Sequence, residues 1–215
     1  MINTIVSWSG GKDSCFALMQ AVQQGYNPVA LLNVLNENGR ISRSHGLPAS
    51  LLQQQADALD LPLHTIASSW QDYETNFINT LKNTAAAHAA QAVVFGDIDL
   101  QPHRDWEEKV CAAAGLKALL PLWHEDRKEL VLRMLREGLR CMIVSCNTHL
   151  GEDFLGRIMD ESLIADLEAK GVDVCGENGE FHTMVTDCPL FAAPIAIPAF
   201  SRVQHEDYWF LQMEG

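Results

Sequence analysis

Basic residues are scarce in this chain of 215 residues. Lys and Arg together number 15 against 28 Asp and Glu, which gives a formal net charge of −13 at pH 7. Proteins that bind duplex DNA or folded RNA draw most of their affinity from Lys and Arg side chains that meet phosphates. The charge balance therefore argues against nucleic acid as a partner and leaves room only for a local basic patch.

Long apolar segments are missing too. No run approaches the roughly 20 residues that a membrane-spanning helix needs. The first residues, Met1-Ile2-Asn3, lead directly into a predicted strand rather than into a signal peptide. We therefore expect no membrane association and a cytoplasmic protein.

The sequence also lacks paired cysteines. The six that it has follow neither a C-x-x-C pattern nor the spacing of a zinc site: Cys15, Cys111, Cys141, Cys146, Cys175 and Cys188. Scattered cysteines in apolar surroundings are typical of reduced, buried thiols. Cys175 differs from the others in its position, directly before a glycine motif described below.

What the sequence does contain is an alternation of apolar strands with helices. Hydrophobic residues make up 47% of the chain, enough for the core of one large domain or two small ones. Predicted strands cover 5–8, 29–35, 63–67 and 92–98, and predicted helices cover 12–24, 49–59, 70–91 and a segment up to Ala114. Strands joined by helical crossovers form a parallel, doubly wound α/β sheet.

The densest signal lies at the start of the chain. An apolar strand, residues 5–8, runs into Gly10-Gly11, which permits a tight turn, and a helix begins directly after it. The first-turn amides of that helix, the Lys12 ammonium and the hydroxyls of Ser9 and Ser14 are predicted to converge on one anion. The alternative is a helix N-terminus with ordinary capping residues.

Asp13 is the unusual member of this group, since a carboxylate beside a phosphate site needs a reason. A magnesium ion supplies one, because Mg²⁺ takes few protein ligands and shares oxygens with phosphates. We therefore predict Asp13 as a magnesium ligand.

The segment Ser9-Gly10-Gly11-Lys12-Asp13-Ser14 resembles the PP-loop, Ser-Gly-Gly-x-Asp-Ser, of the N-type ATP pyrophosphatases. That resemblance implies a Rossmann-like PP-loop ATPase fold that uses ATP and Mg²⁺ and splits ATP into AMP and pyrophosphate. The pattern is not the Walker P-loop of Gly, four residues, then Gly-Lys-Ser/Thr. Transfer of the γ-phosphoryl group is therefore disfavoured.

Further candidates lie where predicted strands end, because open α/β sheets bind ligands at the carboxyl ends of their strands. Gly96 lets a ligand approach closely, and Asp97 is predicted to face the crevice as a second magnesium ligand. Backbone groups around Val34 are expected to hold adenine.

Two more residues near this edge have open alternatives. His45, in the polar loop after the strand 29–35, points to substrate or nucleotide binding, or is a solvated loop residue. Arg104 offers a fork-shaped cation for a phosphate or carboxylate, or pairs with Glu108 one helical turn later.

A more particular resemblance lies further along the chain. The pattern of the diphthine–ammonia ligase family, within the PP-loop superfamily, is followed by Gly96-Asp97-Ile98, Arg104, Glu107, Cys111, Gly115-Leu116 and Pro121-Leu122-Trp123. That family has a second hallmark, a Gly-Glu-x-Gly-Glu-aromatic loop, which corresponds to residues 176–181. By composition alone, residues 175–183 read as a solvated turn before a strand.

The family resemblance implies instead a substrate site that faces ATP. Its residues are Glu177, Asn178, Gly179, Glu180, His182 and Thr183. The same resemblance implies that Glu177, Glu180 and His182 act in catalysis together with Lys12 and Asp13.

The chain departs from the family inside this loop. Members tied to diphthamide typically read Glu-Gly-Gly-Glu-Phe/Tyr-Glu-Thr, whereas Asn178 and His182 replace the first glycine and the last glutamate here. The two changes are similar to those of a bacterial branch for which a link to cobalamin metabolism has been suggested. Because an imidazole differs from a carboxylate in charge and hydrogen bonding, diphthine is not carried over as the substrate.

The predicted organisation is a PP-loop ATP-binding domain, residues 1–120, and a smaller C-terminal α/β domain, residues 121–215, that carries the 176–183 loop. A soft boundary falls at residues 119–123, where Pro121 disfavours a further central strand. The tail from Phe200 onward contains no motif. An apolar face of the second domain is compatible with a homodimer.

Together these features predict an AMP- and pyrophosphate-forming ligase that adenylates a carboxylate and amidates it with ammonia. Its partners would be a small-molecule or peptide-borne carboxylate and ammonia. Two alternatives stay open: a tRNA-modifying PP-loop enzyme, which the acidity and the lack of paired cysteines disfavour, and a sensor that binds ATP or AMP without chemistry.

Overall fold

A parallel sheet forms the first half of the molecule. The computed structural model describes residues 1–213. The sheet has the order β3-β2-β1-β4-β5, made of β1 Asn3–Ser7, β2 Asn27–Leu35, β3 Leu63–Ala67, β4 Ala92–Val94 and β5 Lys117–Leu119. Every neighbouring pair is parallel. The predicted doubly wound α/β fold is confirmed.

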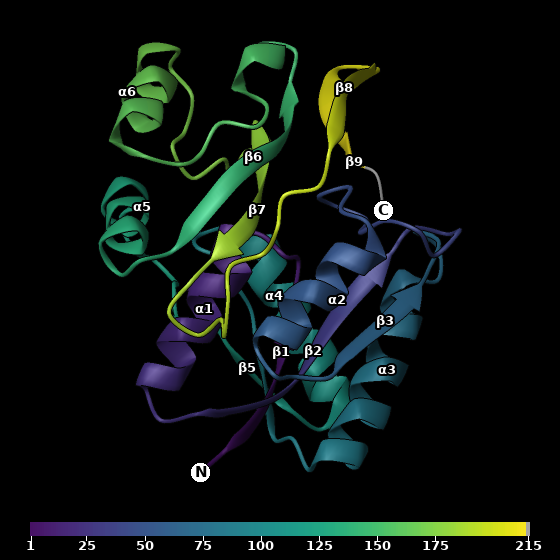
Figure 1. Ribbon diagram of the computed structural model, residues 1–215. Coiled ribbons are helices and arrows are strands. Elements are labelled where there is room, and N and C mark those ends of the chain that lie inside the picture. The colour runs from purple at the N-terminus through teal and green to yellow at the C-terminus, as the bar shows by residue number, and fades with distance from the viewer. Residues whose placement is uncertain (214–215) are drawn as a thin grey trace.

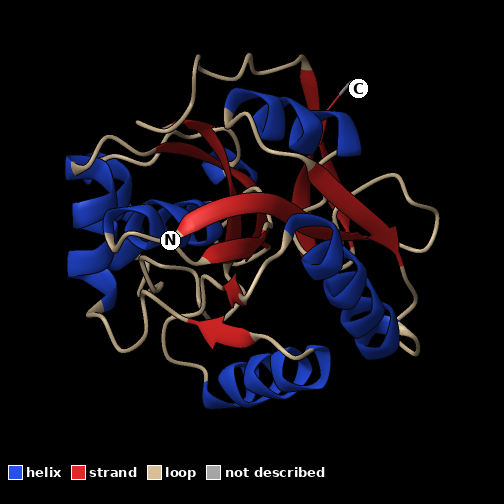
Figure 2. Ribbon diagram, turned by 90° about the horizontal axis from the view of Figure 1, so that it is seen from below, coloured by secondary structure: helices blue, strands red, loops and turns tan. Residues whose placement is uncertain are grey.

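Helices cover both faces of this sheet (Figures 1 and 2). They are α1 Lys12–Gln23, α2 Ala49–Ala58, α3 Tyr73–His88 and α4 Gln101–Ala114. Because side chains alternate along a strand, adjacent residues of β2 enter different cores. Leu31 belongs to the cluster of Phe16 from α1, whereas Leu32 belongs to the cluster of Phe77 from α3.

A smaller unit of strands and helices follows in sequence and lies above the parallel sheet in Figure 1. Its elements are α5 Arg127–Arg136, β6 Arg140–Asn147, the 3₁₀ helix η1 Glu152–Phe154, α6 Glu161–Ala169, β7 Phe181–Asp187, β8 Phe200–His205 and β9 Tyr208–Met213. The strands form an antiparallel sheet in the order β7-β6-β9-β8. Our proposed boundary between residues 120 and 121 falls in the connection from β5 to α5.

The two units are packed against each other. One continuous apolar cluster joins Phe16 of α1 with Val185 of β7. The side chain of Gln55 in α2 is fully buried and donates to the carbonyl oxygens of Gly10, at 3.0 Å, and Val185, at 2.8 Å. Because β7 thus lies directly against the Gly10 turn, the loop that precedes β7 is placed over the ends of β1 and β4.

Several element predictions differ from the structure. The helix predicted over 70–91 spans only Tyr73–His88, since Ala89 takes a left-handed conformation with φ 50°. The strand predicted over 92–98 ends at Val94, because Gly96 turns toward the backbone of Asp13 at the start of α1. The short strand β5 forms despite Pro121, which lies beyond its end at the sheet edge.

The tail also carries structure that its sequence did not indicate. Strands β8 and β9 form a hairpin that pairs with β6 through β9. No helix within residues 1–213 is long and apolar enough to cross a membrane.

Candidate active site

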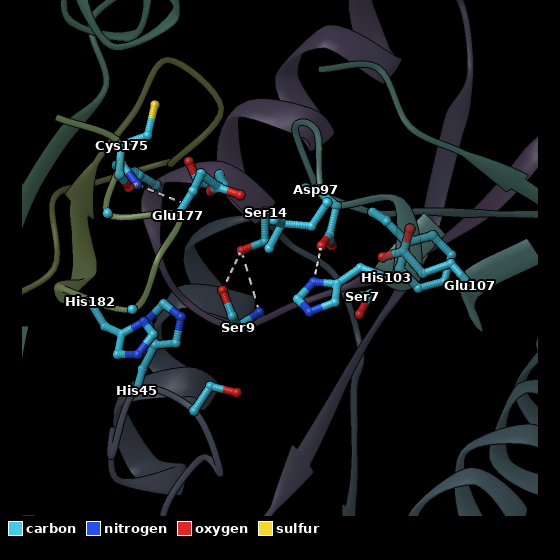
Figure 3. A pocket seen from close by; sticks show the side chains of 18 of the residues that line it. Ser7, Ser9, Ser14, His45, Asp97, His103, Glu107, Cys175, Glu177 and His182 are labelled. Carbon is cyan, nitrogen blue, oxygen red and sulfur yellow. Dashed lines mark hydrogen bonds and ion pairs between the residues drawn. The ribbon is translucent and has the colours of Figure 1, made fainter. Parts of the chain in front are cut away.

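A cavity of about 780 Å³ lies between the two units at the carboxyl ends of the parallel strands. Residues of the first turn of α1, of the segment after β4 and of the loop before β7 all line it. Figure 3 shows Ser9, Ser14, Asp97 and Glu177 around this opening. Segments far apart in sequence therefore meet in one place, as the two sequence motifs predict.

The Ser9–Ser14 segment forms a tight turn between β1 and α1. Gly10 has φ 82°, a conformation that favours glycine. The hydroxyl oxygens of Ser9 and Ser14 are 3.0 Å apart, and the Gly11 amide donates to Ser9 Oγ at 3.3 Å. Ser9, Lys12 and the two residues that follow it line the cavity, whereas the two glycines form the turn behind it.

Lys12 provides the positive charge of the site. Its side chain is buried, with Nζ donating to Asp13 Oδ2 at 2.8 Å and to the carbonyl oxygen of Cys175. Burial works against the charged form, but the Asp13 carboxylate outweighs it and raises the pKa of Lys12. A fixed ammonium that faces a cavity can bind a phosphate.

The two predicted magnesium ligands, Asp13 and Asp97, line the same cavity. Asp13 Oδ1 is buried and accepts no hydrogen bond from residues 1–213. Asp97 Oδ1 accepts from His103 Nδ1 at 2.7 Å, and although burial opposes it, this bond lowers the pKa of Asp97. No group of three or more His, Cys, Asp or Glu in the described chain could hold a metal. Two carboxylates with one free oxygen still fit Mg²⁺ that shares phosphate oxygens.

Residues 173–180, which we call the glycine loop, form the opposite wall. Glu177 lines the cavity, and burial, with the nearby Asp13 carboxylate, raises the pKa of Glu177 to about 7. Glu180 and Asn178 are placed differently from what the family resemblance implies. The Glu180 carboxylate accepts two bonds from Asn178, from its backbone amide and its side chain, both at 3.0 Å. Neither residue is part of the cavity lining, although Gly179 is.

His45 and His182 lie side by side at the rim, with ring centroids 4.7 Å apart (Figure 3). His45 Nδ1 is 2.8 Å from the carbonyl oxygen of Thr183, which can only accept, so Nδ1 carries the proton and Nε2 is an acceptor. Burial lowers the pKa of His45 to about 4 and, with His45 itself, lowers that of His182 to about 3. Both rings are neutral at pH 7. Thr183 also accepts the Lys12 amide on Oγ1 at 3.0 Å.

Val34 and Arg104 lie away from the main cavity. Val34 lines an adjoining pocket of about 100 Å³, which shares Ser9 and His45 with the larger cavity. Arg104 is half-buried, its Nε donating to Glu108 Oε1 at 2.8 Å, and it is not part of the cavity lining. The structure thus forms the Arg104–Glu108 helix pair and does not bring Arg104 into the cavity beside the Ser9–Ser14 turn.

The cavity also contains residues that sequence reasoning missed. They include residues at or just after strand ends and in the first two turns of α3 and α4: Ser7, Tyr73, Glu74, Phe95, His103, Trp106 and Glu107. Tyr73 and Trp106 contact each other with centroids 5.6 Å apart, and burial, with Asp97, raises the pKa of Glu107 to about 11. Their position in the sequence could have indicated them, because both helices begin after the carboxyl ends of strands, where open α/β sheets bind ligands.

The strand order, the glycine turn and the cavity define a doubly wound α/β protein with a ligand cavity at the carboxyl ends of its parallel strands. Two family models match the chain: the diphthamide synthase N-terminal domain over residues 2–118 and the diphthamide synthase C-terminal domain over residues 127–214. The chain belongs to the diphthine–ammonia ligase family, whose members are ATP-dependent, amide-forming ligases.

Individual relatives agree with the family models. The chain is 31% identical to the diphthine–ammonia ligase of Danio rerio, over 93% of this chain and 88% of that protein. It is 30% identical to that of Homo sapiens, over 92% of this chain and 83% of that protein. A solved structure described as a predicted subunit of tRNA methyltransferase from Methanocaldococcus jannaschii is 16% identical with a TM-score of 0.49, over 87% of this chain and 98% of that one. That last likeness is too weak to bear on function.

Proposed function

We propose that this protein is an AMP- and pyrophosphate-forming ligase that joins ammonia to the carboxylate of a substrate other than diphthine. The observation that carries the proposal is one shared cavity, lined both by the Ser9–Ser14 turn and by the Glu177 and His182 side chains. Membership of an amide-forming ligase family supports the reaction class.

In this proposal ATP lies across the strand ends. Its phosphates contact the Ser9–Ser14 turn and the Lys12 ammonium, and its base enters the smaller pocket beside Val34. Asp13 and Asp97 would hold a magnesium ion, for which Asp13 Oδ1 is available. That ion would neutralise charge on the phosphate oxygens.

The first step forms a mixed anhydride. A carboxylate oxygen of the substrate attacks the α-phosphorus, the bond from that phosphorus to the bridging oxygen breaks, and pyrophosphate leaves with the electron pair. Lys12 is placed to stabilise the charge that builds on the phosphate oxygens, because its ammonium is already fixed by Asp13 and Cys175.

The second step forms the amide. The nitrogen of ammonia attacks the acyl carbon, and AMP leaves with the electrons of the acyl–oxygen bond. One proton must leave the nitrogen, and we assign it to the carboxylate of Glu177, which lines the cavity and whose pKa of about 7 suits a base at neutral pH. The protein otherwise contributes positioning, because ATP supplies the leaving group.

The acceptor is the open part of the proposal. The relatives are named for diphthine, whereas Asn178 and His182 depart from the family pattern, and of these two residues His182 lines the cavity. A cobalamin-related carboxylic acid is our candidate. Neutral imidazoles at His45 and His182 favour a neutral or hydrogen-bonding group on the acceptor beside its carboxylate.

Product analysis tests the proposal directly. The protein is incubated with Mg-ATP, ammonium and a panel of carboxylic acids that includes a diphthine peptide and corrinoid precursors. AMP and pyrophosphate released with one acceptor, together with its amide, support the proposal and name the substrate. ADP and phosphate would contradict it, AMP release that depends on tRNA would indicate a tRNA-modifying enzyme, and tight ATP binding without turnover would indicate a sensor.

A further inference from the structure

Arg127, at the first position of α5, connects the two walls of the cavity without lining it. Its guanidinium pairs with Asp99, which follows Asp97 by two residues, through Nε at 2.8 Å and NH2 at 2.7 Å. The remaining nitrogen, NH1, donates to Asp173 at the start of the glycine loop. All three guanidinium nitrogens of Arg127 therefore donate hydrogen bonds to carboxylates, one carboxylate from each unit.

Asp173 transmits this contact to the glycine loop. Its Oδ1 accepts the backbone amide of Cys175 at 3.0 Å, and its Oδ2 accepts the backbone amide of Glu177 at 3.2 Å. The Cys175 thiol donates in turn to the carbonyl oxygen of Arg127 at 3.1 Å. The backbone of Glu177 is thus one hydrogen bond from Asp173 and two from Arg127.

The three side chains of this pairing are only partly exposed. Asp173 is 12% exposed, Arg127 27% and Asp99 31%. The bonds to Asp99 raise the pKa of Arg127, and those bonds lower the pKa of Asp99. A bidentate guanidinium–carboxylate contact also fixes orientation, which a lysine with a single ammonium cannot reproduce.

We propose that Arg127 is a positioning residue for the reaction: it fixes the glycine loop, and with it Glu177, at a set distance from the Asp97 wall of the cavity. This inference rests on the proposed function, since it assigns Glu177 to the substrate half of the site. Its direct consequence concerns the loop alone and is measurable without the acceptor.

Hydrogen exchange tests the loop directly. In Arg127→Met, which keeps the stem but removes the fork, we expect the amides of Cys175 and Glu177 to exchange about tenfold faster or more. Arg127→Lys should fall between that variant and the natural protein. Lys128→Ala is the matched control, because Lys128 is the next residue of α5 and pairs with Glu168 at the surface. It should leave the loop unchanged.

A second measurement separates positioning from general stability. Affinity for an ATP analogue with a methylene bridge between its α and β phosphorus atoms, measured by calorimetry with Mg²⁺, should stay within about twofold in Arg127→Met. Exchange of the β6 core amides should also stay unchanged. Three results in Arg127→Met would each overturn the proposal. They are amide exchange at Cys175 and Glu177 at the same rate as in the natural protein, faster exchange throughout β6, and a tenfold loss of affinity for the analogue.

A second variant and a kinetic measurement extend the test. Where Arg127→Met does not fold, Asp173→Asn keeps the volume of the side chain and should show the same local loss of protection. Once an acceptor is known, Arg127→Met should raise the KM for the acceptor much more than the KM for ATP. Absence of turnover in the natural protein would defeat the proposed function and leave the exchange result standing on its own.

Discussion

At the scale of single residues, Lys12 has one defined task. Its ammonium lies in the cavity wall between Asp13 and the Cys175 carbonyl, where it can meet a phosphate. We expect Lys12→Met to lower pyrophosphate release by about 100-fold or more, since removal of a fixed transition-state donor typically has that effect. The midpoint of thermal unfolding should change far less, because the Asp13 side chain is 24% exposed and Met keeps most of the buried volume of Lys12. Lys82→Met, at an exposed position of α3, is the control. Equal activity of the two variants would refute the phosphate role.

The paired imidazoles give a second prediction, on pH. The pKa values of His45 and His182 in the folded protein, about 4 and about 3, lie below the value near 6.5 of an unfolded chain. Below pH 6.5 the unfolded chain therefore binds protons that the folded protein does not. The free energy of unfolding should fall from pH 6.5 to about 4, and His45→Gln should flatten that slope when urea unfolding is measured across the range. His205→Gln, at an exposed position, should retain it; an equally steep slope in His45→Gln would show that the ring is not kept neutral by the fold.

The same scale shows how far sequence reasoning reaches a site. Ser9, Lys12 and Asp13 were predictable because one short segment carries them, and local chemistry explains each. Tyr73 and Trp106 were not, because an aromatic residue on a helix looks the same in a core as in a cavity wall. The distances across the cavity depend on how two units pack, which no local pattern encodes.

At the scale of elements, Gly96 shows why β4 ends where it does. A Cβ at this position would lie 2.7 Å from the Asp13 carbonyl carbon and from the Ser14 amide nitrogen, which are backbone atoms of α1. Gly96→Ala must therefore push the β4 exit away from α1, at a cost of about 2 kcal/mol. Gly171→Ala is a useful comparison, because its φ of 69° strains an alanine while no atom lies within 4 Å. Urea unfolding should find Gly96→Ala the more destabilised, and only Gly96→Ala should lose affinity for Mg-ATP. A Gly96→Ala variant that binds Mg-ATP normally would contradict the close approach.

Helices and strands were predictable where the hydrophobic periodicity and the residues that end an element, such as glycine, agreed. Strand β3 has the predicted bounds, and α1 ends one residue before the predicted limit, next to Gly25. The C-terminal hairpin was missed because its turn, at Glu206-Asp207, has no glycine or asparagine, and Glu206 takes φ 51° regardless. The hairpin is then stabilised by pairing of β9 with β6, a long-range contact that the local sequence does not predict. The hairpin matters for the site, since Tyr208 Oη donates to the Gly179 carbonyl oxygen at 2.9 Å.

At the scale of the whole molecule, the question is whether the two units are independent. Family models divide the chain near the boundary that we propose, whereas one apolar cluster runs through both units. A cavity built from both walls needs a fixed relative placement, because a small displacement of a reacting group can cost much of the rate. We therefore infer that the units unfold together.

Gln55 offers a test of that inference. Its fully buried side chain accepts from Trp8 Nε1 at 3.0 Å and donates to the carbonyl oxygens of Gly10 and Val185. These bonds connect α2 with both the Ser9–Ser14 turn and β7. Gln55→Leu removes the partner of Trp8 Nε1 and the bond to the Val185 carbonyl oxygen, whereas the Gly10 carbonyl oxygen keeps the Val185 amide at 2.9 Å. Each lost partner costs about 1 kcal/mol or more, which makes about 2 kcal/mol in all. If the units are coupled, urea unfolding followed by far-UV circular dichroism and by tryptophan fluorescence should shift to lower urea as one transition with both probes. Gln53→Leu, on the same helix but exposed, should not shift it. Two separate transitions in the natural protein would show that the cavity forms between independent domains, and nucleotide would then be required to hold its walls together.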